Sequence, residues 1–157
     1  MQKDTAYVLF VCTGNTCRSA MAEALWNRRY QSPRAGSAGT RAWSGQPAAK
    51  FAQDAVAQYG ADLSQHRSRD LDEVTEEPQW VICMTAAQRD VVAERRPEWV
   101  SKTKLLTEWA GEAGDIGDPI GWDREVYDKL ASTLSDLIRR VEPNVPGARP
   151  VENGEDE

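Results

Sequence analysis

The sequence lacks the residues from which most metal sites and disulfide frameworks are built. Histidine occurs once, at His66, and cysteine only three times, at Cys12, Cys17 and Cys83. A structural zinc site draws its ligands from paired cysteine or histidine clusters, and no second cluster accompanies Cys12 and Cys17. An odd number of cysteines also suits a reducing compartment better than a disulfide scaffold. We therefore expect neither a metal ion nor any other cofactor.

Long apolar runs and an excess of basic residues are missing as well. No stretch approaches the roughly 20 apolar residues of a membrane helix, and the polar start MQKDTAY does not resemble a signal peptide. The formal net charge is −6, from 25 acidic and 19 basic residues. Such a balance argues against nucleic acid as a partner, because a phosphate backbone binds a basic face. We expect a cytoplasmic protein with no membrane and no nucleic-acid partner.

The 157 residues are enough for one domain with a substantial core. Short β-branched or apolar segments alternate with amphipathic segments, which predicts an α/β fold with a parallel sheet. Residues 143–157 have the composition of a disordered acidic tail, so the domain is expected to span residues 1–142. Strands are expected at residues 7–11, 35–38, 80–84 and 104–106, and helices at residues 19–30, 47–59, 86–95 and 123–141, with a short one before Pro78.

The loop after the first predicted strand, CTGNTCR at residues 12–18, carries the residues with the clearest chemistry. The N–H groups of this loop and of the first turn of the helix predicted after it lack intrahelical partners. Gly14 lets the backbone curl around an anion. Arg18 adds a planar, bidentate donor suited to phosphate. A cysteine at the base of this positive ring favours the thiolate form, and Ser19 can donate a hydrogen bond to its sulfur. The pattern predicts that the Cys12 thiolate attacks phosphorus while amides and Arg18 hold the phosphoryl oxygens.

The stretch VLFVCTGNTCRSAMAEAL resembles the signature of the low-molecular-weight protein tyrosine phosphatases, which is an apolar strand, C-x-G-N-x-C-R-S, and a helix with A-E. The resemblance continues through SAGT at 37–40, ICM at 82–84 and Asp118-Pro119, in the family's order. It implies the family's fold, a three-layer α/β sandwich with a four-stranded parallel sheet of the flavodoxin-like type.

The resemblance also implies roles for individual residues. Cys12 is the nucleophile that becomes phosphocysteine, and Asp118 protonates the leaving group and then activates water. Asp115 is the rival acid, but no proline follows it. Cys17 resembles the family's second loop cysteine, which can trap an oxidised nucleophile as a disulfide. The expected phosphate-binding residues are Thr13, Gly14, Asn15, Thr16, Cys17 and Arg18, supported by Ser19, Ser37, His66 and Glu23.

Two substrates stay open. Trp43 falls where tyrosine-specific members carry an aromatic wall, which favours phosphotyrosine, although Trp43 can also cover a guanidinium. A threonine at position 16 resembles the pattern of the bacterial branch that acts on phosphoarginine in proteins. The small hydroxyl of Thr16 would leave space and a polar contact for a guanidinium. We predict phosphotyrosine, with phosphoarginine as the alternative. Specificity is expected to depend on Thr16, Trp43, Ile120 and Trp122.

Other classes fit less well. A thioredoxin-coupled arsenate reductase uses the same loop but needs two further cysteines, and only Cys83, which is expected to lie in the core, is present. A module that binds phosphoproteins without turnover would lose Cys12 or Asp118. We therefore predict a monomeric, cysteine-dependent phosphatase whose partner is a phosphorylated protein or a small phosphoester.

Overall fold

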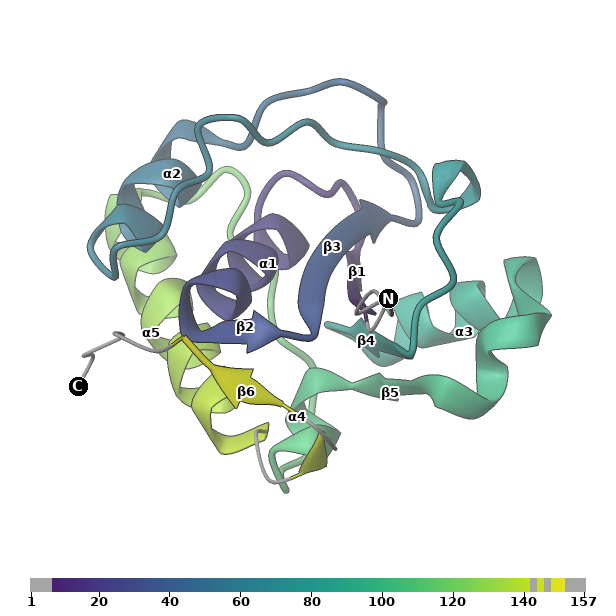
Figure 1. Cartoon of the computed structure of the whole chain (residues 1–157). Coiled ribbons are helices and arrows are strands. Elements are labelled where there is room, and N and C mark those ends of the chain that lie inside the picture. Colours follow the sequence, from purple (N-terminus) through teal and green to yellow (C-terminus); the bar gives the residue numbers. More distant parts are fainter. Residues whose placement is uncertain (1–6, 142–143, 146–147, 152–157) are drawn as a thin grey trace, which may run out of the picture.

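A four-stranded parallel sheet organises the protein, seen in a computed structural model that describes residues 7–141, 144–145 and 148–151. The strand order is β3-β1-β4-β5, and every neighbouring pair is parallel. Figure 1 shows the strands side by side. The strands are β1 (Tyr7–Cys12), β3 (Arg34–Gly39), β4 (Trp80–Cys83) and β5 (Thr103–Leu105).

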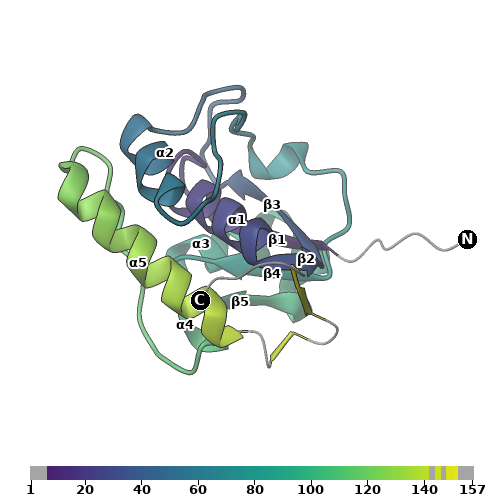
Figure 2. The same cartoon turned by 60° about the vertical axis from the view of Figure 1, so that its left-hand side comes forward.

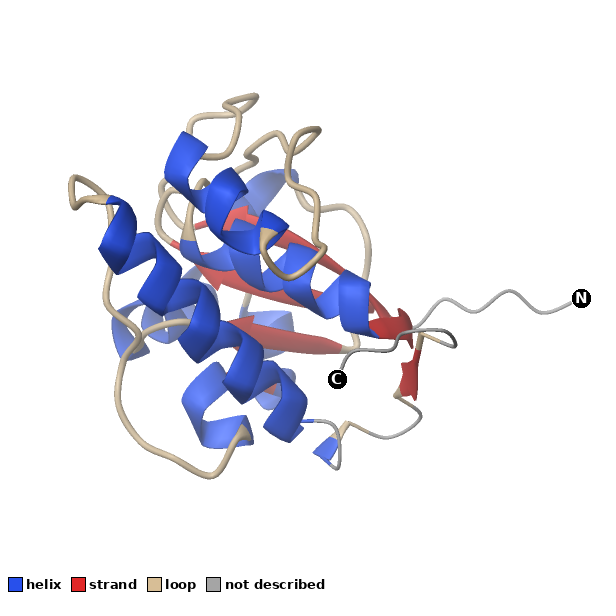
Figure 3. Cartoon of the chain, turned by 90° about the vertical axis from the view of Figure 1, so that its left-hand side faces the viewer, coloured by secondary structure: helices blue, strands red, loops and turns tan. Residues whose placement is uncertain are grey.

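Helices cover both faces of the sheet and make it the middle of three layers, as predicted. One face carries α1 (Arg18–Arg29), α2 (Lys50–Ala57) and α5 (Arg124–Val141), and the other carries α3 (Ala86–Arg95) (Figure 2). In Figure 3 the red strands lie between blue helices in front and behind. The remaining short elements are η1 (Leu71–Glu73), η2 (Pro97–Lys102), α4 (Leu106–Trp109), β2 (Tyr30–Ser32) and β6 (Arg149–Pro150).

The apolar residues of β1 divide between the two cores. Val8 and Phe10 lie in the cluster that includes α1 and α5, whereas Leu9 and Val11 lie in the cluster that includes α3. Successive side chains of a strand point to opposite faces. A central parallel strand is therefore apolar at every position, which is why Val8–Val11 reads as a continuous apolar run.

Several predicted boundaries shift by one to three residues. The predicted helix at 19–30 ends at Arg29, because Tyr30 is extended (φ −117°, ψ 134°) and begins β2. The helix predicted at 47–59 is shorter, spanning Lys50–Ala57. By contrast, α3 has the predicted bounds, and Thr85 caps it by accepting a hydrogen bond from the N–H of Gln88.

Part of the segment expected to be a disordered tail packs on the domain. The strand β6 pairs antiparallel with β2, and Val145 is buried. The Val151 N–H donates to the carbonyl of Arg29 at 2.8 Å. The pairing with β2 satisfies backbone groups of β6, and Val145 gains from burial, so residues 144–145 and 148–151 do not form a separate tail. Residues 143, 146–147 and 152–157 of that segment lie outside the described residues.

The carboxyl ends of β1, β3 and β4 meet at one edge of the sheet, as the parallel registers require. Ligands of open α/β sheets bind outside this edge. The loop from Cys12 to Arg18 leaves β1 here and leads directly into α1. Among the described helices, none has an apolar stretch of the length that a bilayer requires.

Candidate active site

The loop Cys12–Arg18, called the phosphate loop below, holds a buried cysteine sulfur against the start of α1. The Sγ atom of Cys12 lies 2.9 Å from the hydroxyl oxygen of Ser19. It also accepts a hydrogen bond from the Ser19 backbone N–H at 3.4 Å. Both contacts therefore come from the start of α1, where unpaired N–H groups and the helix dipole interact favourably with negative charge.

Asn15 shapes the phosphate loop through an unusual backbone conformation. Its φ of 60° is the only positive value at a non-glycine position among the described residues. The side-chain Nδ2 donates to the hydroxyls of Ser19 (2.8 Å) and Ser37 (2.9 Å). Its Oδ1 accepts from the backbone N–H of Arg69 at 3.0 Å, and the ring Nε2 of His66 lies 2.7 Å from the Asn15 carbonyl oxygen. Asparagine tolerates this left-handed region better than most residues, and these contacts hold it there.

The hydrogen bonds donated by Asn15 run outward in two directions, one through Ser37 toward Glu23 and one through Ser19 toward the Cys12 sulfur. The Ser37 hydroxyl donates to Glu23 Oε1 at 2.6 Å, so it accepts from Asn15. The Ser19 oxygen likewise accepts from Asn15, so its own proton points either to Cys12 Sγ at 2.9 Å or to the Ala38 carbonyl at 3.5 Å, and the sulfur is the nearer of the two. Burial raises the pKa of Glu23 above its ordinary value, and the Ser37 hydrogen bond and the charge of His66 oppose that shift. The structure thus brings together the expected supporting residues behind the phosphate loop.

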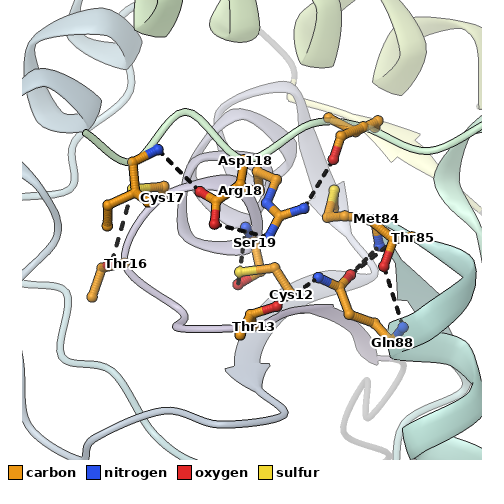
Figure 4. A network of polar contacts seen from close by, with 12 residues as sticks. Cys12, Thr13, Thr16, Cys17, Arg18, Ser19, Met84, Thr85, Gln88 and Asp118 are labelled. Atoms are coloured by element: carbon orange, nitrogen blue, oxygen red, sulfur yellow. Dashed lines mark hydrogen bonds and ion pairs between the residues drawn. The ribbon is translucent and has the colours of Figure 1, made fainter. Parts of the chain in front are cut away.

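Arg18 is buried and points one guanidinium edge at the site. Its NH1 donates to the carbonyl of Ile116 at 2.9 Å, and its NH2 lies 3.5 Å from Asp118 Oδ2 (Figure 4). The Nε atom is buried and has no hydrogen-bond partner. A buried donor without a partner is rare in folded proteins. Here it lies beside a loop shaped for an anion, so a phosphoryl oxygen would satisfy it.

The segment between α4 and α5, residues 110–123, is called the acid loop below. Its two candidate acids differ in their surroundings. Asp118 contacts Arg18, and its side chain is 46% exposed. Asp115 accepts a hydrogen bond from the backbone N–H of Ala86 at 2.9 Å, at the first residue of α3, whereas Asp118 accepts from the N–H of Ile120 within its own loop at 3.1 Å. The geometry therefore favours Asp118 over Asp115 as the group that reaches a leaving group above the phosphate loop.

The expected specificity residues divide into one loop residue and three exposed side chains. Thr16 lies in the phosphate loop, and its Oγ1 is 3.8 Å from Cys17 Sγ. Trp43, Ile120 and Trp122 are 80%, 58% and 64% exposed. Such exposure of large apolar side chains leaves them available to a substrate.

The other two cysteines are also buried, and their surroundings differ from those of Cys12. Cys17 Sγ lies 3.6 Å from the hydroxyl oxygen of Tyr127 in α5. Burial raises the pKa of Cys17, and the hydrogen bonds with Tyr127 and Thr16 oppose the shift. Cys83 lies in the core as expected, and burial raises its pKa to about 12. All three cysteines are free thiols.

Sequence reasoning missed two residues that contact the phosphate loop. Tyr127 contacts Cys17, and Gln88 donates from Nε2 to Thr13 Oγ1 at 3.1 Å (Figure 4). Gln88 had a signal in the sequence, since it lies three residues after the capping Thr85, where a capping box places glutamine or glutamate. Tyr127 had none beyond the apolar face of its helix. No group of three or more potential metal-ligating side chains lies within the described ranges.

Comparison with known proteins gives consistent matches over most of the chain. A family model described as low molecular weight phosphotyrosine protein phosphatase matches residues 7–146. The protein-arginine-phosphatase of Geobacillus stearothermophilus is 40% identical over 139 residues, which are 85% of this chain and 92% of that protein. The probable low molecular weight protein-tyrosine-phosphatase EpsP of Ralstonia nicotianae is 33% identical over 143 residues, 90% of this chain and 95% of its own. The crystal structure of the low molecular weight protein tyrosine phosphatase from T. tengcongensis superposes with a TM-score of 0.82 at 37% identity, covering 89% of this chain and 99% of that one.

Proposed function

The chain belongs to the low molecular weight phosphotyrosine protein phosphatase family and is a cysteine-based phosphatase, and from this premise we propose which residues carry the reaction. Cys12 is the nucleophile, Arg18 and the amides of the phosphate loop hold the phosphoryl group, and Asp118 is the general acid and base. The observation that carries this assignment is the unpartnered, buried Nε of Arg18 at the end of the loop whose first residue, Cys12, accepts a hydrogen bond from the Ser19 N–H.

The first step transfers the phosphoryl group to sulfur. The Cys12 thiolate attacks phosphorus, an S–P bond forms, and the bond from phosphorus to the leaving group breaks. Asp118 gives its proton to the departing oxygen or nitrogen, which would otherwise leave as a poor anion. Arg18 and the loop amides stabilise the charge on the three equatorial oxygens.

The second step hydrolyses the phosphocysteine. Asp118, now a carboxylate, accepts a proton from water as the water oxygen attacks phosphorus. The S–P bond breaks, the thiolate of Cys12 is restored, and inorganic phosphate leaves with Asp118 protonated again. The hydrogen bonds from Ser19 to the sulfur support this step, because they stabilise the departing thiolate.

Replacement of the nucleophile tests this assignment. We expect Cys12→Ser to abolish turnover of an aryl phosphate, because a serine hydroxyl is a far weaker nucleophile than a thiolate at neutral pH. Cys83→Ser is the matched control, since the Cys83 side chain lies in the core cluster that includes α3, whereas Cys12 lies in the cluster that includes α1 and α5. Turnover that survives in Cys12→Ser would contradict the assignment.

Phosphotyrosine in proteins is the first candidate substrate. The family description and the exposed aromatic side chains of Trp43 and Trp122 support it, because an aromatic ring stacks on a phenol ring. The Asp118 side chain is partly exposed, which allows it to reach a phenolic oxygen above the loop.

Phosphoarginine in proteins is the second candidate, and Thr16 is the observation that favours it. A threonine hydroxyl at the loop surface offers a guanidinium both space and a hydrogen-bond acceptor. The similarity to a protein-arginine-phosphatase at 40% identity supports the same substrate. Trp43 fits either substrate, since a guanidinium also stacks on an indole ring.

A pair of peptides ranks the two candidates. Initial rates are measured on matched phosphotyrosine and phosphoarginine peptides with the wild type, Thr16→Ile and Thr16→Ser. If phosphoarginine is the substrate, Thr16→Ile lowers its rate about tenfold or more relative to phosphotyrosine, whereas Thr16→Ser preserves the ratio. A ratio that Thr16→Ile leaves unchanged contradicts a role for Thr16 in choosing phosphoarginine.

We also propose a monomer in the cytoplasm without a nucleic-acid or membrane partner. The three free thiols support a reducing compartment. The net charge of −6 supports the absence of a nucleic-acid partner. Sedimentation of the purified protein tests whether it is a monomer, and cell fractionation tests its cytoplasmic location.

A further inference from the structure

The turn that joins β4 to α3 contacts both loops of the active site. The segment called the β4–α3 turn below comprises Met84, Thr85 and the first three residues of α3, and its last residue, Gln88, is only 3% exposed. Figure 4 shows the turn beside Cys12 and Thr13, close to Arg18. Neither the chemistry of phosphoryl transfer nor the capping of α3 by itself requires such a double contact.

The first contact ties the β4–α3 turn to the phosphate loop. Gln88 Oε1 accepts the backbone N–H groups of Met84 and Thr85, both at 3.0 Å. Because both lone pairs of this oxygen are used, the amide nitrogen faces away and donates to Thr13 Oγ1 at 3.1 Å. A buried partner lost here would not be replaced by water. Gln88 therefore fixes the residue that follows the nucleophile.

The second contact ties the same turn to the acid loop. The Ala86 N–H donates to Asp115 Oδ1 at 2.9 Å, and the Ile116 N–H donates to the carbonyl of Met84 at 2.9 Å. The Asp115 carboxylate thus lies at the positive end of α3, which stabilises its negative charge. Asp118 follows three residues later, within a reach of about 10 Å for an extended chain. Fixing Asp115 and Ile116 therefore restricts where the Asp118 carboxyl group can lie.

We propose that the β4–α3 turn sets the acid loop in register with the phosphate loop, and that Asp115 and Gln88 are positioning residues of the reaction. Asp115 acts through Asp118 and so affects proton delivery to the leaving group. Gln88 acts through Thr13 and so affects binding of the phosphoryl group. The proposal rests on the proposed function, because it takes Asp118 as the acid and the phosphate loop as the phosphoryl site.

The Asp115 arm is tested with leaving groups of different acidity. Asp115→Ala is expected to lower kcat on phenyl phosphate about tenfold, and on p-nitrophenyl phosphate less than about threefold, because a displaced acid matters most for a poor leaving group. KM should stay within about twofold. Asp115→Asn keeps an oxygen that accepts from Ala86 and should restore most of the kcat on phenyl phosphate. An equal loss on both substrates, or none, overturns this arm.

Glu112→Ala is the matched control for Asp115→Ala. It also removes one carboxylate from the acid loop, but Glu112 pairs with Arg140 of α5 rather than with α3. We expect its dependence of kcat on the leaving group to match that of the wild type. A change equal to that of Asp115→Ala would mean that charge, and not the contact with Ala86, is responsible, and would overturn this arm.

The Gln88 arm is tested with a double-mutant cycle of Gln88→Met and Thr13→Val. Each single variant is expected to raise the inhibition constant of inorganic phosphate about three- to tenfold without changing the dependence on the leaving group. The inhibition constant of the double variant should not exceed that of the more affected single variant, because the same hydrogen bond is lost in all three. Additive effects overturn the arm. Thr13→Val leaves the cap of α3 intact, so the arm stays testable if Gln88→Met unfolds.

The proposed function fails in a different way. If Asp118→Ala loses activity equally on both aryl phosphates, the assignment of the acid itself is wrong. If Asp118→Ala shows the leaving-group dependence and Asp115→Ala does not, the acid stands and only the role of the β4–α3 turn is wrong. The two failures are read from the same set of rates.

Discussion

The guanidinium of Arg18 and the carboxylate of Asp118 lie 3.5 Å apart, although one begins α1 and the other lies in the loop before α5. This ion pair connects the phosphate loop to the acid loop. The same Arg18 donates to the carbonyl of Ile116, so it contacts the acid loop at two points. Arg18 is therefore placed both to bind a phosphoryl oxygen and to keep Asp118 near the leaving group.

Replacement of Asp118 should expose its role as an acid. Asp118→Ala is expected to lower kcat by about 100-fold or more on phenyl phosphate and far less on p-nitrophenyl phosphate, because a good leaving group departs without a proton. Steady-state rates over a series of aryl phosphates measure this dependence. A uniform loss across the series would place the acid elsewhere.

Asn15 should contribute through both its side chain and its backbone. Asn15→Ala loses the hydrogen bonds to Ser19 and Ser37 and also keeps a side chain at a φ of 60°. Asn15→Gly loses the same hydrogen bonds but adopts this φ at no steric cost. We expect Asn15→Ala to have the lower free energy of unfolding, by about 1 kcal/mol. Urea unfolding of both variants measures the difference, and equal values would contradict backbone strain at this position.

The C-terminal half of the site was harder to predict from sequence than the phosphate loop. The phosphate loop was predictable because its donors, glycine and nucleophile are contiguous between a strand and a helix. The contact between Gln88 and Thr13 joins residues 75 positions apart, so no local pattern encodes it. It depends on how α3 packs beside the carboxyl end of β1.

Fold prediction failed where tertiary contacts override local preference. Tyr30 continues the helical pattern of α1, yet it is extended, fully buried, and donates to the carbonyl of Ile138 at 3.1 Å. Burial of a tyrosine with a satisfied hydroxyl outweighs one more residue of helix. Likewise, β6 pairs with β2, which lies more than 100 positions earlier in the chain, so the strand propensity of residues 149–150 alone does not predict this pairing.

The raised pKa of Glu23 predicts a pH dependence of stability. Because the folded state raises this pKa above the ordinary 4.5, the folded protein holds the proton over a range where the unfolded chain has lost it. Stability is therefore fully present below pH 4.5 and falls as pH rises through the folded-state value. Glu23→Gln removes this titration but keeps an oxygen for Ser37.

Urea unfolding at a series of pH values tests this pH dependence. From about pH 4.5 upward, the wild type should lose free energy of unfolding relative to Glu23→Gln. Parallel curves for the two proteins would mean that the pKa of Glu23 does not differ between the folded and unfolded states.

Tyr127 should stabilise the phosphate loop through Cys17. Tyr127→Phe removes the hydroxyl that contacts the Cys17 sulfur but keeps the ring that packs edge-on against Phe51, whose centroid is 5.6 Å away. We expect a loss of about 1 kcal/mol in the free energy of unfolding, the usual contribution of one buried hydrogen bond. Cys17→Ala removes the other partner, so adding it to Tyr127→Phe should cost less than the sum of the two single changes. Strict additivity would show that the contact contributes nothing.

The most direct test of the central claim is to trap the covalent intermediate. The enzyme is mixed with an aryl phosphate, quenched rapidly, digested and analysed by mass spectrometry. We expect one phosphoryl group on the peptide that contains Cys12, attached to sulfur. With a good leaving group, Asp118→Ala should hold more of this intermediate, because the second step then lacks its base. A phosphoryl group on any other residue, or single-turnover release of phosphate with none on Cys12, would contradict the central claim.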